Sequence, residues 1–273
     1  MKSRQKQVFH FYFHVNRLVM SLVMICLSLI FQSQIVHAQK KKWGNSSVDT
    51  PSFKCPTDLK NQALLDVLYE QMEKTSNQAQ VRSQYKKAKV IVFKQVEAQV
   101  AGGDQLQTLY SGKFVKFEDG RWPNDVNCEH VWPRSWMGNK SDFDFSLKES
   151  DMHNLFPEFA DVNRLRGNLP FAELSRNENE AVYPSMMGKA SSGKQAFMPR
   201  AEVRGDVARV LFYFSMRWKL PIYQEQEAIL KKWAKADPVS EREIQRNQLI
   251  AQLQGNVNPF IVCPKLFEQI ADF

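Results

Sequence analysis

The segment that most constrains how this chain can fold is a strongly apolar run at residues 207–218. Polar residues at 204–206 precede it and can cap the start of a helix. A helix that is apolar on nearly every side has to be buried, so we expect this one to be central to the core. Residues 224–236 and 240–254 are expected to form two further helices that complete a largely helical shell.

The first half of the chain contains patterns of both helix and strand. Apolar positions recur every three to five residues over 58–75, which predicts an amphipathic helix. Residues 85–100 mix β-branched residues with helix formers, and a helix is favoured there. Residues 109–117 alternate apolar and polar side chains around a Ser-Gly turn, which predicts a short β-hairpin.

The stretch from residue 141 to residue 162 divides into a polar part and an apolar part. Residues 141–151 are charged and are expected to form a loop. Residues 152–162 have apolar positions at helical spacing, but Pro157 interrupts them. The pattern predicts a broken helix, and Asn163 lies near its end.

The first 38 residues contain four basic residues, no acidic residue, an apolar run at 18–31 and a small-residue site at 36–38. This order predicts a signal peptide, 1–38, that is cleaved near Ala38. A retained membrane anchor is the alternative, but about 14 apolar residues are fewer than the roughly 20 that a bilayer crossing needs. Residues 39–52 are expected to be a flexible lead-in to one domain at 53–273.

Removal of the leader lowers the net positive charge, which is one indicator of a nucleic-acid-binding protein. The whole chain has 37 basic and 29 acidic residues, a net charge of +8, and loses four basic residues with the leader. The remaining net charge of +4 is only mildly basic. A local basic face could still bind phosphates, but this charge alone does not identify a nucleic-acid-binding protein.

Cysteine and histidine counts limit the metal sites that the mature chain can build. Cys55, Cys128 and Cys263 remain after cleavage. In an oxidising compartment we expect Cys55 to pair with Cys263 and tie the ends of the domain, although all three could stay unpaired. Outside the leader, the histidines are His130 and His153. A three-histidine zinc site is therefore excluded, and the lack of a CxxC motif excludes a structural zinc finger.

Glu129 and His130 are neighbours that together offer groups needed for phosphodiester cleavage. A neutral imidazole can take a proton from water at ordinary pH. If the chain bends at residues 131–133, Glu129 can ligate a hard cation while His130 faces the attacking water. The amide oxygen of Asn163 would complete an oxygen site that suits Mg²⁺. Taken alone, such a dipeptide is weak evidence, and a surface or packing role is the default.

Four short blocks of sequence reverse that default. NCEHVWPRS at 127–135, DMHNL at 151–155, DVNRLRGN at 161–168 and RGDVAR at 204–209 resemble successive blocks of the endonuclease I family. Residues 233–260 resemble the C-terminal region of the same family. Because the resemblance covers most of the chain from residue 85 to residue 260, it is more specific than any single motif.

The resemblance implies an α+β fold, in which a ββα-metal finger is embedded in a mostly helical single domain. In such a finger, two strands and a helix hold one divalent ion. His130 matches the general base of the family, and Glu129 and Asn163 match its metal ligands. Mg²⁺ is the expected cofactor, with Mn²⁺ and Ca²⁺ as alternatives.

Four other residues receive expected roles from their places in these blocks. Glu149 matches an acidic residue that binds the ion through water or assists the leaving group. Arg166 matches an arginine that could clamp the scissile phosphate, with a structural ion pair at a helix end as the alternative. His153 is expected to be a buried, hydrogen-bonded imidazole, and Arg209 a structural residue or part of the DNA cleft.

The chain also departs from the better-known secreted members of the family. Its insert between His130 and Asp151 is short, and most of the cysteines of those members are absent. The arginine that those members place in the longer insert has no secure counterpart here. Arg134 and Lys140 are the candidates for stabilising the leaving group in its place.

These inferences predict an exported, metal-dependent endonuclease that cuts DNA, and also RNA, with little base specificity. The mature chain is expected to be a monomer in the periplasm or outside the cell, with no membrane contact. Two other functions remain open at this point. One is a nucleic-acid-binding module without catalysis, and the other is a metal-dependent phosphomonoesterase.

Overall fold

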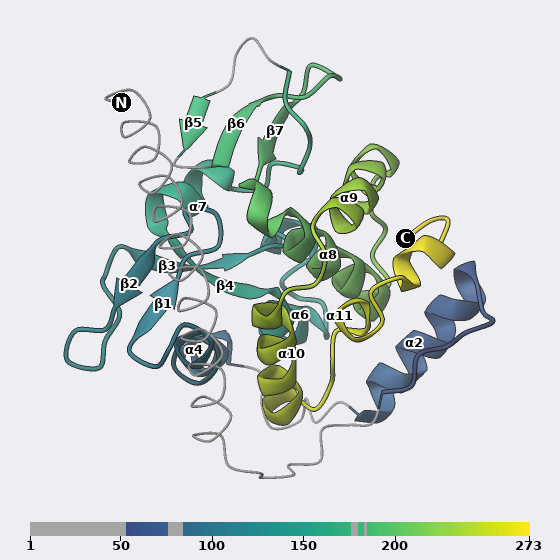
Figure 1. The fold of residues 1–273 in the computed structure, drawn as a ribbon, viewed down its shortest axis with the longest axis horizontal. Coiled ribbons are helices and arrows are strands. Elements are labelled where there is room, and N and C mark those ends of the chain that lie inside the picture. The colour runs from purple at the N-terminus through teal and green to yellow at the C-terminus, as the bar shows by residue number, and fades with distance from the viewer. Residues whose placement is uncertain (1–52, 76–83, 176–179, 183–184) are drawn as a thin grey trace, which may run out of the picture. The chain divides into compact units, whose positions relative to one another are not determined.

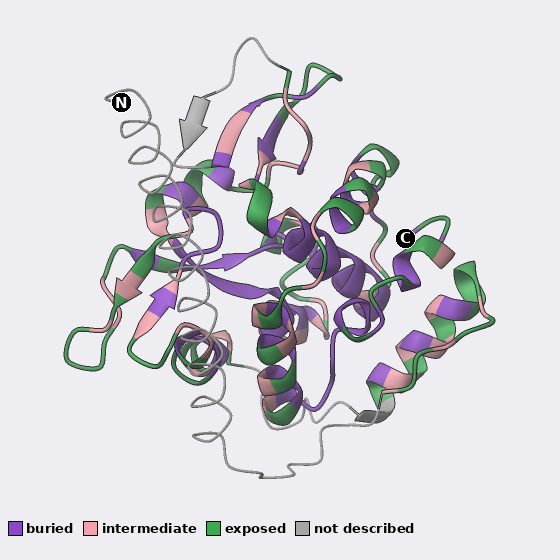
Figure 2. Cartoon of the chain, viewed as in Figure 1, coloured by how far each residue is buried: buried purple, intermediate pink, exposed green. Residues whose placement is uncertain are grey.

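The computed structural model describes residues 53–75, 84–175, 180–182 and 185–273, so the expected signal peptide at 1–38 and lead-in at 39–52 lie outside the described residues. The apolar run near the C-terminus forms helix α8 (Arg204–Trp218), which is buried along nearly its whole length (Figure 2). Helices α2 (Asn61–Thr75), α9 (Gln224–Ala236) and α11 (Pro259–Val262) pack against α8. The predicted core helix is therefore confirmed.

The other helices of the C-terminal half also agree with the sequence. α9 has the predicted bounds, and α10 (Glu241–Gln254) begins after Ser240, which forms a capping box with Glu243. Arg209 of α8 is buried and donates hydrogen bonds to both carboxylate oxygens of Glu243, which makes it a structural residue. A short helix, η5 (Leu266–Gln269), follows α11. Within the described residues, no helix is both long enough and apolar enough to cross a membrane.

The predicted helices of the first half are present as well. α2 begins at Asn61, three residues after the predicted start. Residues 85–100 are helical throughout, as α4 (Tyr85–Ile91), the π-helical segment η1 (Val92–Glu97) and α5 (Ala98–Val100). The buried carboxylate of Glu97 binds Arg242 (2.8 Å) and Arg246 (2.6 Å), and so joins this segment to α10.

The described strands form three small antiparallel sheets, ordered β1–β2, β3–β4 and β5–β6–β7. The strands are β1 (Gln105–Gln107), β2 (Phe114–Lys116), β3 (Val126–His130), β4 (Leu155–Phe159), β5 (Glu180–Val182), β6 (Ser185–Lys189) and β7 (Gln195–Met198). The short helices between them are η2 (Arg134–Trp136), α6 (Phe145–Glu149), η3 (Met152–Asn154), α7 (Ala160–Arg166) and η4 (Ala201–Val203). This mixture confirms the α+β class.

The predicted hairpin is present, but its first strand was misplaced. β2 pairs with β1, so the first strand lies at 105–107 and Leu109 is part of the turn. Leu109 and Tyr110 are buried there, because the Glu158 carboxylate accepts hydrogen bonds from the backbone of Tyr110 and Ser111 and holds the turn against β4.

The expectation for residues 141–162 is wrong in two places. The loop expected at 141–151 contains α6, and the broken helix expected at 152–162 is the turn η3, the strand β4 and the start of α7. Leu155 and Phe156 are both buried, so β4 lacks the alternation that identifies a half-exposed strand. Pro157 fits in β4 because this strand pairs with one other strand, β3.

Helix α10 and the loop after it hold the segment in front of β4. Arg246 donates hydrogen bonds to the carbonyl oxygens of Met152 (2.9 Å) and Leu155 (2.6 Å). His153 is buried, and its Nε2 lies 3.0 Å from the carbonyl oxygen of Asn256. The expected buried, hydrogen-bonded imidazole is confirmed.

The buried His153 is expected to make stability depend on pH. Burial lowers the pKa of its imidazole to about 4, below the value of about 6.5 in an unfolded chain. Its contribution is therefore complete above about pH 6.5 and is lost as the pH falls towards about 4. Between about pH 7 and pH 4, wild type should lose about 3 kcal/mol more unfolding free energy than His153→Gln. Urea unfolding of both proteins measures this difference, and parallel losses would contradict it.

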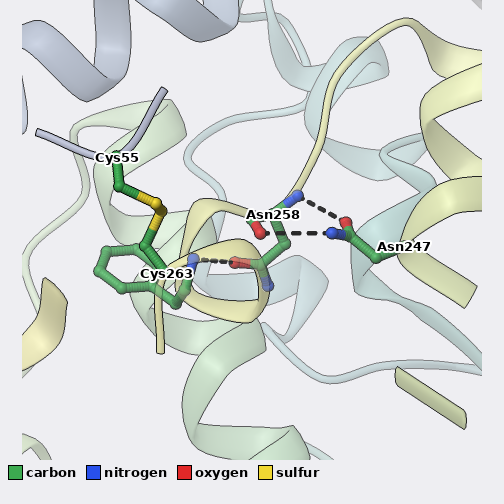
Figure 3. Close-up of a disulfide and its surroundings, with 5 residues drawn as sticks. Cys55, Asn247, Asn258 and Cys263 are labelled. Atoms are coloured by element: carbon green, nitrogen blue, oxygen red, sulfur yellow. Dashed lines mark hydrogen bonds between the residues drawn. A yellow bond between two sulfur atoms is a disulfide. The ribbon is translucent and has the colours of Figure 1, made fainter. Parts of the chain in front are cut away.

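A disulfide joins Cys55 to Cys263 and confirms the expected pairing (Figure 3). Next to it, the backbone N–H of Asn258 donates a hydrogen bond to the Asn247 side chain of α10 (2.7 Å). The bridge thus fastens the segment before α2 to the end of α11. Cys128, in β3, is a buried free thiol.

Loss of this disulfide is expected to lower the free energy of unfolding by about 2–5 kcal/mol. The physical reason is that the bridge spans a sequence separation of 208 residues and restricts the unfolded chain. Urea unfolding of the double variant Cys55→Ser, Cys263→Ser measures the loss. Dithiothreitol should destabilise wild type to the same level and leave the double variant unchanged. A reduced wild type as stable as the oxidised one would argue against the bridge.

Candidate active site

β3, β4 and α7 form one unit, in which two antiparallel strands lead directly into a helix (Figure 1). The strands pair over their whole lengths, with His130 opposite Leu155. The backbone N–H of Ala160 donates to the carbonyl oxygen of Asp125 (2.7 Å) and fixes the corner between β4 and α7. The helix ends at Arg166, and Gly167 follows it with a φ of 52°, which suits glycine. This is the strand-strand-helix arrangement that the resemblance implied.

A cavity of about 330 Å³ is lined by residues of β3, of the loop after it and of α7. Glu129, His130 and Asn163 all line it, so the structure brings the three predicted residues together. β3 ends at His130 and the chain then turns into η2, which lets two consecutive side chains reach the same cavity. The other lining residues are Tyr85, Asn127, Cys128, Pro133, Arg134, Ser135, Gly167 and Asn168.

The imidazole of His130 is oriented by the backbone of Glu149. Its Nε2 lies 2.9 Å from the Glu149 carbonyl oxygen. A carbonyl oxygen only accepts, so Nε2 carries the hydrogen and Nδ1 carries the free lone pair. Burial lowers the pKa of His130 to about 4, which keeps the ring neutral near pH 7. The imidazole is therefore in the state that a general base requires.

The carboxylate of Glu129 is buried and held through one oxygen. Oε1 accepts hydrogen bonds from the Tyr110 hydroxyl (2.8 Å) and from Arg166 (3.0 Å), whereas Oε2 has no hydrogen-bond partner among the residues that the structure describes. Burial raises the pKa of Glu129 to about 7, although the charge of Arg166 acts in the opposite direction. A divalent cation at Oε2 would favour the ionised carboxylate.

Asn163 contributes an amide oxygen to the same cavity. Its Nδ2 donates to the carbonyl oxygen of Cys128 (3.0 Å), which leaves Oδ1 without a hydrogen-bond partner in the described part of the chain. A carboxylate oxygen and an amide oxygen are hard donors of the kind that Mg²⁺ prefers. Over the described ranges, no cluster of three or more His, Cys, Asp or Glu residues could hold an ion. Glu129 and Asn163 therefore provide oxygen donors of the kind that such an ion takes.

Glu149 acts through two different groups. Its carbonyl oxygen orients His130, while its carboxylate forms an ion pair with Arg134, whose side chain is about half exposed. Arg134 lines the cavity, whereas Lys140 is exposed and is not among the lining residues. Of the two basic candidates, Arg134 is therefore the one placed to meet a phosphate in the cavity.

Arg166 is not placed to clamp a phosphate. It is fully buried, and its guanidinium donates hydrogen bonds to Glu129 and to the carbonyl oxygens of His130 (3.0 Å) and Val131 (2.7 Å). The ring of Phe171 covers the guanidinium, with 4.5 Å between its centroid and the guanidinium carbon. All these partners belong to the protein interior. The geometry contradicts the direct contact and agrees with the structural alternative.

Tyr110 is a residue of the site that the sequence did not reveal. Its hydroxyl fixes Glu129 from 19 positions earlier in the chain, and its ring is buried against Phe197. The alternation at 109–117 marked it only as a residue of the hairpin. Tyr110 lies in the turn, where its backbone N–H donates a hydrogen bond to the Glu158 carboxylate. This position directs its hydroxyl towards the interior.

Comparison with known proteins gives matches over the same region. A family model described as Endonuclease I matches residues 57–265. The chain is 36% identical to an extracellular deoxyribonuclease of Aeromonas hydrophila over 56% of this chain and 80% of that protein. It is 33% identical to a periplasmic deoxyribonuclease of the same organism over 56% and 77% of the two chains. It is 32% identical to an extracellular ribonuclease of Bacillus amyloliquefaciens, over 65% of each chain.

Proposed function

Because this chain belongs to the endonuclease I family of nucleases, we propose that it is an exported, monomeric endonuclease that hydrolyses phosphodiester bonds with one divalent ion. DNA and RNA are its substrates, a proposal supported by the names of its deoxyribonuclease and ribonuclease relatives. Their extracellular and periplasmic names support export. The observation that carries the proposal is the one cavity that Glu129, His130 and Asn163 share.

His130 is the general base of this reaction. Its Nδ1 takes a proton from the water that attacks phosphorus, while the hydrogen bond from Nε2 to Glu149 keeps the ring in one orientation. The new P–O bond forms as the bond to the 3′ oxygen breaks, which leaves a 5′ phosphate and a 3′ hydroxyl that takes its proton from solvent. A Mg²⁺ ion bound by Glu129 and Asn163 would supply positive charge against the charge that builds up on the phosphate.

Arg134 adds positive charge at the same cavity. Its partner Glu149 holds it in a partly exposed ion pair, and such pairs are weak enough for a phosphate to compete for the guanidinium. In this proposal His130 acts on the attacking water, and Arg134 and a bound ion would meet the phosphate, so none of these groups reads a base. We therefore expect cleavage with little base specificity.

A plasmid-nicking assay tests the proposed function. With Mg²⁺, the purified protein should convert supercoiled plasmid into nicked and linear forms, and it should also degrade single-stranded RNA. Addition of EDTA should stop both reactions, and excess Mg²⁺ should restore them. A folded wild-type protein that leaves plasmid intact under these conditions would overturn the proposal. Faster turnover of a model phosphomonoester than of plasmid would identify a phosphomonoesterase instead.

Asn163→Ala is expected to raise the Mn²⁺ concentration that gives half-maximal cleavage by about 10- to 100-fold, because one of the two protein oxygens is lost. Calorimetric titration with Mn²⁺, which can replace Mg²⁺ at oxygen sites, should show the same weakening without any substrate. Asn139→Ala, an exposed asparagine outside the cavity, is the matched control and should bind Mn²⁺ as wild type does. Unchanged Mn²⁺ affinity in Asn163→Ala would remove Asn163 from the site.

A further inference from the structure

A second cavity of about 210 Å³ lies next to the first, since Ser135 lines both. One wall comes from the segment after β3, with Trp132 and Trp136, and the other comes from the loop between α8 and α9, with Ile222 and Tyr223. Gln226, in the first turn of α9, also lines it. The proposed cleavage reaction assigns no role to this cavity.

Three aromatic rings line it together with the aliphatic side chains of Leu220, Pro221 and Ile222, and the rings meet at defined angles. The rings of Trp136 and Tyr223 are perpendicular, with centroids 6.3 Å apart. Trp132 meets Trp136 edge to face at 6.2 Å and is stacked on Phe214 of the core at 5.3 Å. Tyr223 is 72% exposed, so it presents its ring to solvent at the rim of a rigid aromatic wall. A flat ring of a ligand could stack there.

The cavity also offers a hydrogen-bond donor, the side-chain amide of Gln226. The Oε1 atom of Gln226 accepts from the backbone N–H of Phe171 (2.9 Å), and its Nε2 has no partner among the described residues. Aromatic walls with an amide donor suit a planar heteroaromatic ring that carries acceptor atoms. They suit a purely apolar side chain or a lipid tail less well, because those leave the donor unpaired.

The position of this cavity fits the repeat of a nucleic-acid strand. Arg134, at the first cavity, is placed to meet a phosphate, and Trp136, two residues later in η2, lines the second. Each nucleotide joins a phosphate to a base, so a cavity with Arg134 next to a cavity with aromatic rings matches adjacent parts of one strand. We propose that the second cavity binds the unpaired base of a nucleotide that flanks the scissile phosphate. This proposal rests on the proposed function.

An oligonucleotide with one cleavable bond tests this proposal. A single-stranded DNA carries phosphorothioates at all linkages except one phosphodiester, and the nucleotide on either side of that bond is either intact or abasic. For wild type, removal of one of these two bases should lower kcat/KM about 5- to 150-fold, the range that base–aromatic stacking provides. Tyr223→Ala should cut the intact oligonucleotide more slowly and respond much less to the missing base.

Two variants make the result specific. Tyr223→Phe keeps the ring and should restore the response to the missing base. Phe143→Ala removes an aromatic residue that is 94% exposed and lies outside both cavities, and it should behave as wild type. Equal effects of the abasic sites on wild type and on Tyr223→Ala would overturn the proposal.

Binding separates this proposal from the proposed cleavage reaction. The affinities of wild type and Tyr223→Ala for the same intact and abasic oligonucleotides are measured by fluorescence anisotropy in EDTA. Base-dependent binding that Tyr223→Ala abolishes supports the base site even for a protein that cuts nothing. Cleavage of the intact oligonucleotide with base-independent binding and rates would leave the nuclease standing and reject the base site.

Discussion

Replacement of His130 by alanine is expected to leave a folded protein that cuts plasmid about 10²- to 10⁴-fold more slowly than wild type. The substitution removes the neutral imidazole whose Nε2 is fixed by the Glu149 carbonyl and whose Nδ1 faces no protein partner in the described residues. Rates on supercoiled plasmid at saturating Mg²⁺, together with a urea unfolding curve, measure both effects.

Two comparisons distinguish loss of the base from a general disturbance. His153→Gln changes the other described histidine, which lies in the core and not at the cavity, and should cut as wild type does near pH 7. Added imidazole should partly restore cleavage by His130→Ala, because the substitution enlarges a cavity that is open to solutes. Near-normal cleavage by His130→Ala would assign proton abstraction to another group.

Arg166→Met is expected to lower the free energy of unfolding by about 3–5 kcal/mol, the usual cost of removing one partner of a buried ion pair. The buried carboxylate of Glu129 would lose its cationic partner, and two carbonyl oxygens would lose their donors. Urea unfolding measures the loss. Arg164→Met removes an exposed charge from the same helix and should change stability by less than about 1 kcal/mol.

The same pair of variants also decides what Arg166 does. If it supports Glu129, a correctly folded fraction of Arg166→Met should bind Mn²⁺ more weakly, because the carboxylate is no longer fixed. If it clamps the phosphate, the variant would keep wild-type stability and Mn²⁺ affinity and would lose only cleavage. That outcome would reverse the structural assignment made from its burial.

The longer helices were the part of the fold that the sequence predicted well, because their signals are local. The apolar run in α8, the bounds of α9 and the cap of α10 at Ser240 are all decided within one segment. β4 was missed for the same reason. Its five residues are mostly buried, so only pairing with β3 distinguishes the strand from part of a helix, and pairing is not local.

The same holds for the candidate site: residues in local sequence blocks could be predicted, and residues that folding brings in from other segments could not. Glu129, His130 and Asn163 lie in recognisable sequence blocks, and the structure places all three at one cavity. The role of Arg166 depends on burial, which its block does not encode. Tyr110 and Tyr223 come from segments far from those blocks, and only the folded chain brings them to Glu129 and to Trp136.

The hydrogen bonds from Arg246 to the segment before β4 also bear on when the site can form during synthesis of the chain. A ribosome releases residues 129–163 well before it adds Arg246, which lies 91 positions after Leu155. Until then, the carbonyl oxygens of Met152 and Leu155 lack the guanidinium that binds them. A nascent or truncated chain that stops before α10 therefore carries every residue of the proposed catalytic group without the frame that positions it. Cleavage should therefore require that α10 has been made.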